Sequence, residues 1–337
     1  MVLDIQNFLS LRDQLPDVDV RSEGEFGQGH IPGASNIPIL NNTERIAVGT
    51  DYKQKGQAEA IKTGFRLVGP RIIDIVTGAE RLASGNELLV HCWRGGMRSA
   101  NFCQFVGMAK VKTHQLEGGY KSYRHVANES FKSHLKLVVI GGYTGSGKSE
   151  ILRALKVRGE QIIDLESLAS HRGSSFGGLL LPPQPTTEQF QNDLFENIRT
   201  LDLSRRIWIE DESIAVGRIF LPESLWRTMC SASLIEINVD KENRIRRLVD
   251  EYGPSDKSQF LHAMERIAKK LGGQHFNAAK EKWLMGDKPA TMDILLNYYD
   301  KAYLNGLQGK TQRIKFRTSW NGSDHQTLVD ELLQTNF

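Results

Sequence analysis

The sequence predicts an α/β fold with two domains, each built around a mostly parallel sheet. Short apolar segments of the kind that form buried strands alternate along the chain with stretches of helical periodicity. Two of these segments, residues 88–90 and 137–140, each lead into a glycine-rich turn that opens a helix. The 337 residues, 39% of them hydrophobic, suffice for two domains of ordinary size. We place these domains at residues 1–130 and 136–337.

Composition limits the functions that need considering. The formal net charge of +3 permits contact with a polyanion but does not require it. The three cysteines, Cys92, Cys103 and Cys230, form no disulfide framework and no paired metal-ligand spacing, which fits a reducing compartment. No segment approaches the roughly 18 to 20 apolar residues of a membrane helix. We therefore expect a soluble, cytoplasmic protein without a membrane partner, in which Cys103 and Cys230 are packing residues.

The first domain alternates brief apolar segments with helical stretches. The apolar segments lie at residues 18–21, 36–39 and 88–90, the helical stretches at 57–67, 72–83 and 99–109, and a polar connection follows at 119–133. In open parallel sheets, the reactive crevice lies at the carboxyl ends of the strands. Cys92 comes directly after one such strand and is expected at this edge.

The segment around Cys92 suits a reactive thiol. Gly95 and Gly96 form the turn before a helix, so that backbone N–H groups point inward at the helix N-terminus, where negative charge is stabilised. Arg94 and Arg98 add full positive charges. Such surroundings lower the pKa of a thiol, and the thiolate is the nucleophile. The spacing Cys-x5-Arg also lets the loop hold a phosphate-like group against the sulfur; the alternative is a buried structural cysteine.

Several motifs in order give the first 125 or so residues a resemblance to rhodanese domains. They are Asp19-Val-Arg21, Glu25-Phe26, the segments 29–34 and 116–120, and the Cys92 loop. The resemblance implies that Cys92 carries sulfur or selenium, and that Asp19 and Arg21 support the site or bind substrate. The loop is one residue longer than the usual sulfur-carrying loop, and in this it is similar to rhodanese-like dual-specificity phosphatases.

Residues 41–56 are polar and carry the basic residues Arg45, Lys53 and Lys55 together with Tyr52. Basic side chains interleaved with an aromatic ring can hold a phosphate backbone and a base. These four residues are our candidates for binding a nucleic acid, and the alternative is a solvated loop.

The second domain opens with a phosphate-binding motif. The strand at residues 137–140 leads into Gly142-x2-Gly145-x-Gly147-Lys148-Ser149, and a helix is predicted at 150–157. The glycines let backbone N–H groups wrap a phosphate chain, Lys148 reaches its terminal oxygens, and Ser149 is a candidate magnesium ligand. The motif recognises phosphates rather than one particular nucleotide.

Further strands and helices continue the alternation. Strands are predicted at residues 161–166, 206–212, 234–239 and 312–317, and helices at 241–251, 257–271, 276–285, 291–305 and 323–333. The acids at two strand ends, Asp164 and either Glu210 or Asp211, are candidates for binding the substrate or for holding magnesium and its water. The alternative is that these charges only meet solvent.

A glycine- and serine-rich segment lies between the second and third of these strands. His171, Arg172, Ser174 and Ser175 belong to it and are candidates for binding substrate, because such a turn can bind an anion or act as a mobile flap. The alternative is an ordinary loop.

Taken over nearly its full length, the chain resembles the bacterial tRNA 2-selenouridine synthases. The order of a rhodanese module and a P-loop module carries this resemblance, together with the stretches 43–53 and 171–177. It implies a transferase that converts wobble 2-thiouridine in tRNA to 2-selenouridine through S-geranyl-2-thiouridine. Geranyl diphosphate and selenophosphate would be its co-substrates, and the synthase of selenophosphate is a candidate delivery partner. Cys92 would carry the selenium as a perselenide, whereas the P-loop fits the prenyl diphosphate and ATP equally well.

Three other functions stay open at this point. The first is a rhodanese-type sulfurtransferase fused to an ATP-dependent, kinase-like P-loop domain. The second is a phosphatase built on the Cys-x5-Arg loop, although no general acid is evident nearby. The third is a non-catalytic protein that binds tRNA or a nucleotide.

Overall fold

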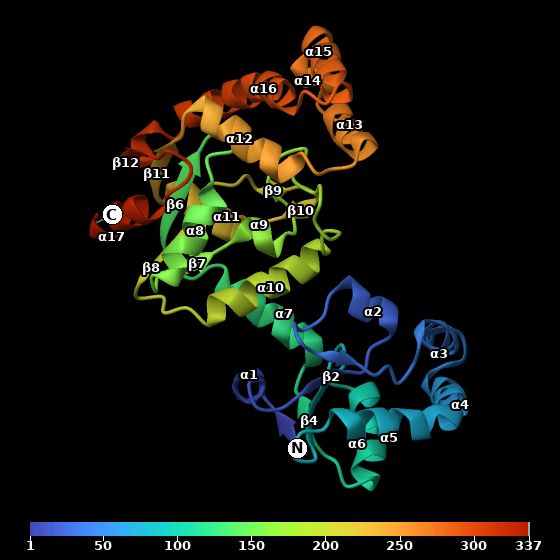
Figure 1. Ribbon diagram of the computed structural model, residues 1–337. Helices are drawn as coiled ribbons and strands as arrows, with labels where there is room; N and C mark the ends of the chain where they lie inside the picture. The colour runs from blue at the N-terminus through green and yellow to red at the C-terminus, as the bar shows by residue number, and fades with distance from the viewer. Residues whose placement is uncertain (336–337) are drawn as a thin grey trace. The chain divides into compact units, whose positions relative to one another are not determined.

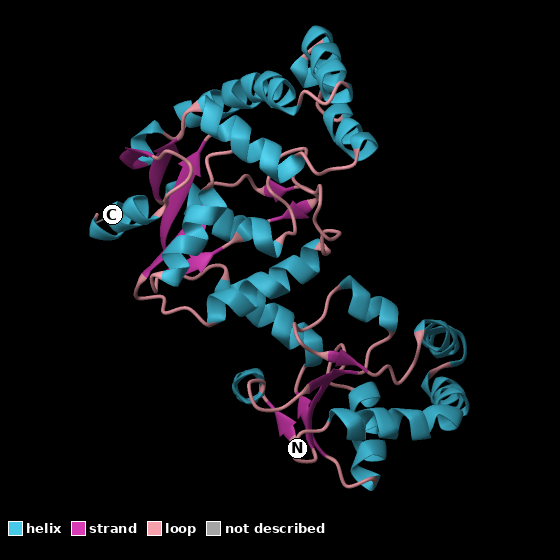
Figure 2. Ribbon diagram, viewed as in Figure 1, coloured by secondary structure: helices cyan, strands magenta, loops and turns pink. Residues whose placement is uncertain are grey.

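The computed structural model describes residues 1–335 and divides the chain into two compact units. The first is Met1–Ser130, and the second begins at Phe131. Each unit contains its own parallel sheet with helices packed against it, as Figure 1 and Figure 2 show for each. The predicted α/β class with parallel sheets is therefore confirmed. Among the described residues, no helix combines the length and the apolar composition needed to span a membrane.

The sheet of the first unit has the order β1-β5-β4-β2-β3, with every pairing parallel. Its strands are β1 (Val2–Leu3), β2 (Asp17–Asp19), β3 (Ser35–Asn36), β4 (Glu87–His91) and β5 (Lys112–Leu116). Its helices are α1 (Ile5–Leu11), α2 (Glu23–Gln28), α3 (Asn42–Lys55), α4 (Gln57–Val68), α5 (Ile72–Leu82), α6 (Met97–Met108) and α7 (Gly119–Ser130), with a short 3-10 turn, η1 (Gly69–Arg71).

The central strand β4 brings Cys92 to the edge where the functional residues gather. Leu88, Leu89 and Val90 are fully buried, so the strand is fixed by apolar contacts on both faces. In the parallel register Asp19 of β2 pairs with His91 of β4. The segments that follow β2 and β4 therefore leave the sheet side by side, and the segment after Asp19 lies next to Cys92.

The sheet of the second unit has the order β12-β11-β6-β8-β7 and is again parallel. Its strands are β6 (Lys136–Gly142), β7 (Gln161–Ile163), β8 (Arg206–Glu210), β11 (Ser233–Asn238) and β12 (Ile314–Ser319), and a hairpin joins β9 (Ala215–Val216) to β10 (Ile219–Phe220). Its helices are α8 (Lys148–Val157), α9 (Leu165–Leu168), α10 (Thr187–Arg199), α11 (Glu223–Ser231), α12 (Lys241–Tyr252), α13 (Lys257–Glu265), α14 (Ala268–Leu271), α15 (Gly273–Leu284), α16 (Lys288–Gln308) and α17 (Gln326–Gln334), with a 3-10 turn, η2 (Thr311–Arg313).

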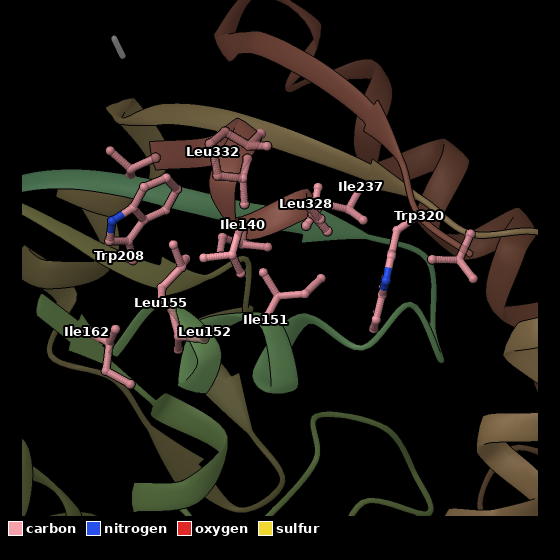
Figure 3. Close-up of a cluster of buried hydrophobic side chains, with 14 residues drawn as sticks. Ile140, Ile151, Leu152, Leu155, Ile162, Trp208, Ile237, Trp320, Leu328 and Leu332 are labelled. Atoms are coloured by element: carbon pink, nitrogen blue, oxygen red, sulfur yellow. The ribbon is translucent and has the colours of Figure 1, made fainter. Parts of the chain in front are cut away.

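One apolar cluster fixes the helix that follows the phosphate-binding motif. Figure 3 shows Ile151 and Leu155 of α8 beside Ile140 of β6, with Leu328 of α17 in the same cluster. All four side chains are at most 3% exposed. Burying each contributes roughly 1.5–3 kcal/mol. The N-terminus of α8 is therefore held firmly at the end of β6.

The structure differs from the sequence predictions in four elements. Residues 42–55 form the helix α3 rather than a solvated loop, because Asn41 and Glu44 cap its N-terminus reciprocally. The connection predicted at 119–133 is mostly the helix α7, whose Tyr120 is fully buried. The strand predicted at 161–166 ends at Ile163, because Asp164 caps α9. The helix predicted at 257–271 is broken into α13 and α14.

The two secondary cysteines also differ from each other. Cys103 is partly buried on α6 and contacts the core of the first unit, as predicted. Cys230 on α11 is exposed, so its prediction as a packing residue is wrong. The apolar face of α11 is instead formed by Leu225 and Met229.

Candidate functional sites

Cys92 lies at the bottom of a short loop between β4 and α6, and its side chain is only 3% exposed. Its Sγ atom is 3.2 Å from the hydroxyl oxygen of Ser99 in the first turn of α6. Burial opposes ionisation of the thiol. Hydrogen bonds from Ser99 and from the backbone N–H of Arg94 outweigh burial, with help from the charge of Arg98, and lower the pKa of Cys92 below its ordinary value. Cys92 is therefore prepared to act as a thiolate.

We predict that replacing Ser99 by alanine raises the pKa of Cys92, because the sulfur loses its hydrogen-bond partner. The measurement is the pH dependence of Cys92 alkylation by iodoacetamide, followed by mass spectrometry of the peptide. The midpoint should lie below that of an ordinary thiol in the unmodified protein and should move upward in Ser99→Ala. The exposed Cys230 serves as the internal control and should keep its midpoint. An unchanged midpoint for Cys92 would show that Ser99 does not stabilise the thiolate.

The shape of the Cys92 loop depends on two glycines. Gly95 has φ +66°, and a Cβ atom there would lie 2.6 Å from the carbonyl oxygen of Leu116. Gly119 has φ +60°, and its Cβ would lie 2.3 Å from the carbonyl oxygen of Cys92 itself. Both positions require glycine because the two backbones touch. The start of α7 thus braces the loop, and the backbone N–H of Tyr120 donates to the Cys92 carbonyl at 2.8 Å.

The two arginines of the loop have different surroundings. Arg98 donates two hydrogen bonds to the Glu25 carboxylate, of 2.7 and 3.3 Å, and Arg45 donates a third of 3.1 Å. Burial raises the pKa of Glu25, but these cations, led by Arg98, bring it below its usual range. Arg94 is exposed and lines the hollow above Cys92. Sequence reasoning quoted Glu25 only as a motif residue and missed that it orients Arg98.

Asp19 and Arg21 form a buried base beneath the site. Arg21 donates 2.9 and 2.7 Å hydrogen bonds to Asp19, and its guanidinium lies 3.9 Å from the ring centre of Tyr120. His91 lies between two acids, with Nδ1 2.8 Å from Asp17 and Nε2 3.3 Å from Asp19. All these charged groups are at most 4% exposed. Asp19 and Arg21 therefore support the loop through Tyr120 and do not face the hollow.

The contacts of His91 with Asp17 and Asp19 make the stability of the first unit depend on pH. Burial alone would lower the pKa of His91, but the Asp17 and Asp19 carboxylates raise it to about 10. The pKa of His91 in the unfolded chain is near 6.5. The stabilisation that protonated His91 gives the folded unit is therefore complete below pH 6.5 and is lost as the pH rises to 10. We predict that the urea concentration at which Cys103 becomes available to iodoacetamide falls between pH 6.5 and 10. His91→Gln should remove most of this dependence, and an equal slope in both proteins would contradict the ion-pair account.

Tyr52 reaches the Cys92 hollow from α3. The hollow is lined by Tyr52, Trp93, Met97 and both loop arginines, with Cys92 at its base. Of the other candidates for binding tRNA, Arg45 contacts Glu25, and Lys55 pairs with Asp51 at 2.8 Å. Lys53 is exposed on the same helix. The structure thus brings Tyr52 and Arg45 to the site and leaves Lys53 and Lys55 outside it.

The phosphate-binding loop of the second unit has the geometry that its motif predicts. Gly142 ends β6, Gly145 has a positive φ of 80°, and Gly147 precedes α8 with φ +75°. A Cβ atom on Gly147 would lie 2.5 Å from Arg247 and from Trp320, so this position tolerates no side chain. Lys148 and Ser149 then begin the helix, whose N-terminal N–H groups favour a phosphate.

Two acids that were not chosen from the sequence lie beside this loop. The Ser149 hydroxyl donates to Glu166 at 2.7 Å. Burial and the neighbouring Glu166 carboxylate raise the pKa of Glu212 to about 8, and the charge of Lys148 opposes this rise. Glu166 and Glu212 therefore face the loop, and sequence reasoning missed both as site residues. The sequence pointed only to their surroundings, because Glu166 lies two residues after Asp164 and Glu212 lies one residue after Asp211.

The acids that were chosen have other partners. Asp164 caps α9 by accepting from the backbone N–H of Ser167 at 2.8 Å. Asp211 accepts two hydrogen bonds from Lys310, of 2.6 and 2.8 Å. Glu210 is fully buried and accepts from the backbone N–H of Leu165. Burial and the nearby Asp164 and Glu166 raise the pKa of Glu210 well above its usual range. Each of these three acids has a partner within the protein, so the alternative that they only meet solvent is wrong.

The segment containing His171 is a packed turn rather than a mobile flap. Phe176 is 3% exposed and stacks on Phe260 with ring centres 4.7 Å apart. Arg172 pairs with Glu251 at 2.6 Å, and the backbone N–H of Ser175 donates to the hydroxyl of Tyr299. The Ser174 hydroxyl accepts from the backbone N–H of Phe176, and His171 is buried.

The same turn nevertheless borders the phosphate-binding loop. A Cβ atom on Gly173 would lie 2.9 Å from the carboxylate of Glu212. On the other flank, Arg244 of α12 pairs with Asp300 at 2.7 Å, and Arg247 contacts Glu150 and Gly147. The loop is thus enclosed by the turn and by the basic helix α12.

The donors near Ser149 fit a magnesium ion bound together with phosphate. Within residues 1–335, no three His, Cys, Asp or Glu side chains are grouped as a complete metal site. Mg²⁺ does not need one, because it takes one or two protein oxygens and fills its remaining positions with water and phosphate. The Ser149 hydroxyl and the Glu166 carboxylate supply such oxygens.

Comparisons with known proteins agree over both units. A family model described as the tRNA 2-selenouridine synthase AAA domain matches residues 135–327, and one described as a rhodanese-like domain matches residues 6–125. A tRNA 2-selenouridine synthase of Sulfurovum sp. is 36% identical, covering 90% of this chain and 91% of the relative. Its counterpart in Cronobacter sakazakii is 35% identical and covers 91% of each chain. That of Nitrosomonas europaea is 30% identical, over 94% of each.

Proposed function

Since this chain belongs to the tRNA 2-selenouridine synthase family, we propose that it converts wobble 2-thiouridine to 2-selenouridine in two steps carried by two sites. The P-loop site promotes geranylation of the sulfur by geranyl diphosphate. The Cys92 site then exchanges the geranylated sulfur for selenium from selenophosphate. A thiocarbonyl sulfur is a poor leaving group, whereas an alkylated sulfur departs as a thiolate, and the order of the steps follows from this difference.

The observation that carries the proposal is the environment of Cys92. A thiol with a lowered pKa lies beneath backbone N–H groups and between Arg94 and Arg98. The cations and the helix N-terminus suit the phosphate end of selenophosphate, and this arrangement would leave the selenium against the sulfur of Cys92. Glu25 holds Arg98 at the rim until an anion competes for it.

The P-loop is assigned to the prenyl donor on its charge and its enclosure. The backbone N–H groups and Lys148 are placed to bind a diphosphate and to stabilise the charge that develops on it as the carbon–oxygen bond breaks. Ser149 and Glu166 would hold Mg²⁺, which neutralises diphosphate oxygens when bound. Burial and the neighbouring Glu166 carboxylate raise the pKa of Glu212, which weakens its repulsion of the diphosphate.

Contacts to tRNA are assigned to α3 and to the rim of the Cys92 hollow. Tyr52 offers an aromatic face beside Cys92, and Trp93, 37% exposed, offers a second. Unpaired bases of RNA stack on such rings, and arginine and lysine contact the phosphates. Arg45, Lys53 and Lys55 lie on the same helix and would contact the anticodon backbone.

The test is a reconstitution in which each co-substrate is omitted in turn. The purified protein is incubated with 2-thiouridine tRNA, and the wobble nucleosides are measured by mass spectrometry. Geranyl diphosphate alone should give S-geranyl-2-thiouridine, both co-substrates should give 2-selenouridine, and selenophosphate alone should give neither. No nucleoside change with both present, accompanied by turnover of thiosulfate and ATP, would instead favour a sulfurtransferase fused to a kinase-like domain.

A further inference from the structure

An apolar pocket opens between three helices of the first unit, beside the Cys92 loop. Val48 and Tyr52 of α3 line it, together with Ile61 and Phe65 of α4 and Phe105 of α6. Gln57, Arg98 and Asn101 supply polar side chains, and the rest of the lining is mainly hydrophobic. The selenium transfer proposed at Cys92 does not by itself require this pocket.

The pocket adjoins the Cys92 hollow. Tyr52, Met97 and Arg98 line both cavities, so these side chains form their common border. Cys92 and Arg94 belong to the hollow alone. A ligand whose reacting atom lies against Cys92 can therefore extend an attached group across Met97 into the pocket.

The rim of the pocket exposes large apolar side chains. Tyr52 is 59% exposed, Phe65 57% and Met97 50%. Because all three side chains line one pocket, their exposed apolar surface is grouped rather than scattered singly. A nucleobase would leave its polar edges without enough partners here, since few polar side chains line the pocket. An aliphatic chain meets no such cost.

We propose that this pocket binds the ten-carbon prenyl chain of S-geranyl-2-thiouridine during the exchange of sulfur for selenium. This inference rests on the proposed function and names the part of its substrate that the first unit recognises. In the exchange, carbon 2 of the base gains a bond to the selenium of selenophosphate, whose bond to phosphorus is cleaved by water to release phosphate, and loses its bond to sulfur. Geranyl thiolate departs with the electron pair of the broken bond and takes up a proton. Its chain lies next to Cys92 because it is bonded to the leaving atom.

The size of the pocket agrees with this occupant. Its volume is about 160 Å³, and an apolar cavity of about 150 Å³ takes up a molecule of the size of benzene. The pocket therefore accommodates the distal part of a ten-carbon chain, and the proximal carbons lie along the border at Met97. Arg98 at that border stays available for the phosphate end of the selenium donor.

Gly64 of α4 provides a way to fill the pocket without disturbing the helix. It lines the pocket, its φ is not in the left-handed region, and a Cβ atom there meets nothing within 4 Å. Gly64→Leu places an apolar side chain into the space and favours the helix, because leucine is a better helix former than glycine. Gly107→Leu is the matched control. Gly107 lies on α6, is exposed, does not line the pocket and also has nothing within 4 Å of its Cβ position.

The experiment compares two substrates in the second half-reaction alone. Anticodon stem-loops carrying S-geranyl- or S-methyl-2-thiouridine are incubated with selenophosphate, and kcat/KM is measured for each. The unmodified protein should prefer the geranyl substrate. Gly64→Leu should lower that preference by about tenfold or more, mainly through KM. Phe65→Ser, an exchange of an exposed rim residue, should lower it to a smaller extent, whereas Gly107→Leu should keep it.

The outcomes distinguish a failure of the pocket assignment from a failure of the proposed function. Conversion of the geranyl substrate by the unmodified protein, with its preference retained in both Gly64→Leu and Phe65→Ser, would overturn the pocket and leave the function standing. No conversion of either substrate by the unmodified protein would overturn the proposed function itself. A binding measurement tests the pocket without turnover. Geraniol should slow the alkylation of Cys92 in the unmodified protein but not in Gly64→Leu. Equal slowing in both proteins would contradict the assignment of the pocket to the prenyl chain.

Discussion

Replacing Cys92 by serine is expected to abolish the formation of 2-selenouridine and to let S-geranyl-2-thiouridine accumulate. A serine hydroxyl is not ionised near neutral pH and is a much weaker nucleophile than a thiolate. We expect the rate of selenouridine formation to fall by roughly three orders of magnitude or more, as when other catalytic nucleophiles are removed. The first step should continue, because the P-loop and the side chains described around it belong to the second unit. The measurement is mass spectrometry of the wobble nucleosides.

Cys230→Ser is the control for this prediction. Cys230 is exposed on α11 in the second unit and lies outside the Cys92 hollow. The Cys230→Ser variant should form selenouridine at the rate of the unmodified protein. If Cys92→Ser also did so, the thiol would have no role in selenium transfer.

Replacing Lys148 by alanine is expected to abolish geranylation. Lys148 begins α8 and, in the proposed first step, would bring a full positive charge to the diphosphate. Removing one group that stabilises a developing negative charge lowers the rate roughly 10²- to 10³-fold. The readout is S-geranyl-2-thiouridine formed from 2-thiouridine tRNA and geranyl diphosphate.

Lys156→Ala is matched to this exchange, because Lys156 lies on the same helix, in its last turn, and is exposed. It should geranylate normally. If Lys148→Ala kept geranylation but lost a measurable ATPase, the loop would bind ATP and the prenyl donor would have to bind elsewhere.

The features that sequence reasoning located well are contiguous motifs. The Cys92 loop and the phosphate-binding loop each consist of neighbouring residues between a strand and a helix, so local geometry determines where their groups point. The parallel sheets followed from the alternation of strands and helices. The cap formed by Asn41 and Glu44 was also a local signal, and attention to it would have identified α3 as a helix.

The features that it missed depend on contacts between distant parts of the chain. Glu25 and Arg98 are 73 positions apart, and His91 and Asp17 are 74 positions apart. The acids at the end of β8 and directly after it show the same limit. Glu210, Asp211 and Glu212 are consecutive, yet one faces Leu165, one Lys310 and one the P-loop lysine. Which acid faces which partner is set by the path of the chain after the strand ends, and periodicity contains no information about that path.

The apolar pocket likewise depends on contacts between distant parts of the chain. Its lining comes from α3, α4 and α6, and no single segment of the sequence has the composition of a prenyl site. Val48, Ile61 and Phe105 each fit an ordinary amphipathic helix. Only the packing of the three helices beside the Cys92 loop turns these residues into one surface.

The measurement that tests the division of labour most directly supplies S-geranyl-2-thiouridine tRNA and selenophosphate to Lys148→Ala. The P-loop variant should convert this substrate to 2-selenouridine at close to the rate of the unmodified protein, although it cannot make the substrate from 2-thiouridine. Cys92→Ser should leave the same substrate unchanged. If Lys148→Ala formed no 2-selenouridine from the geranylated tRNA, the two steps would not be divided between the two sites, and the central claim would be wrong.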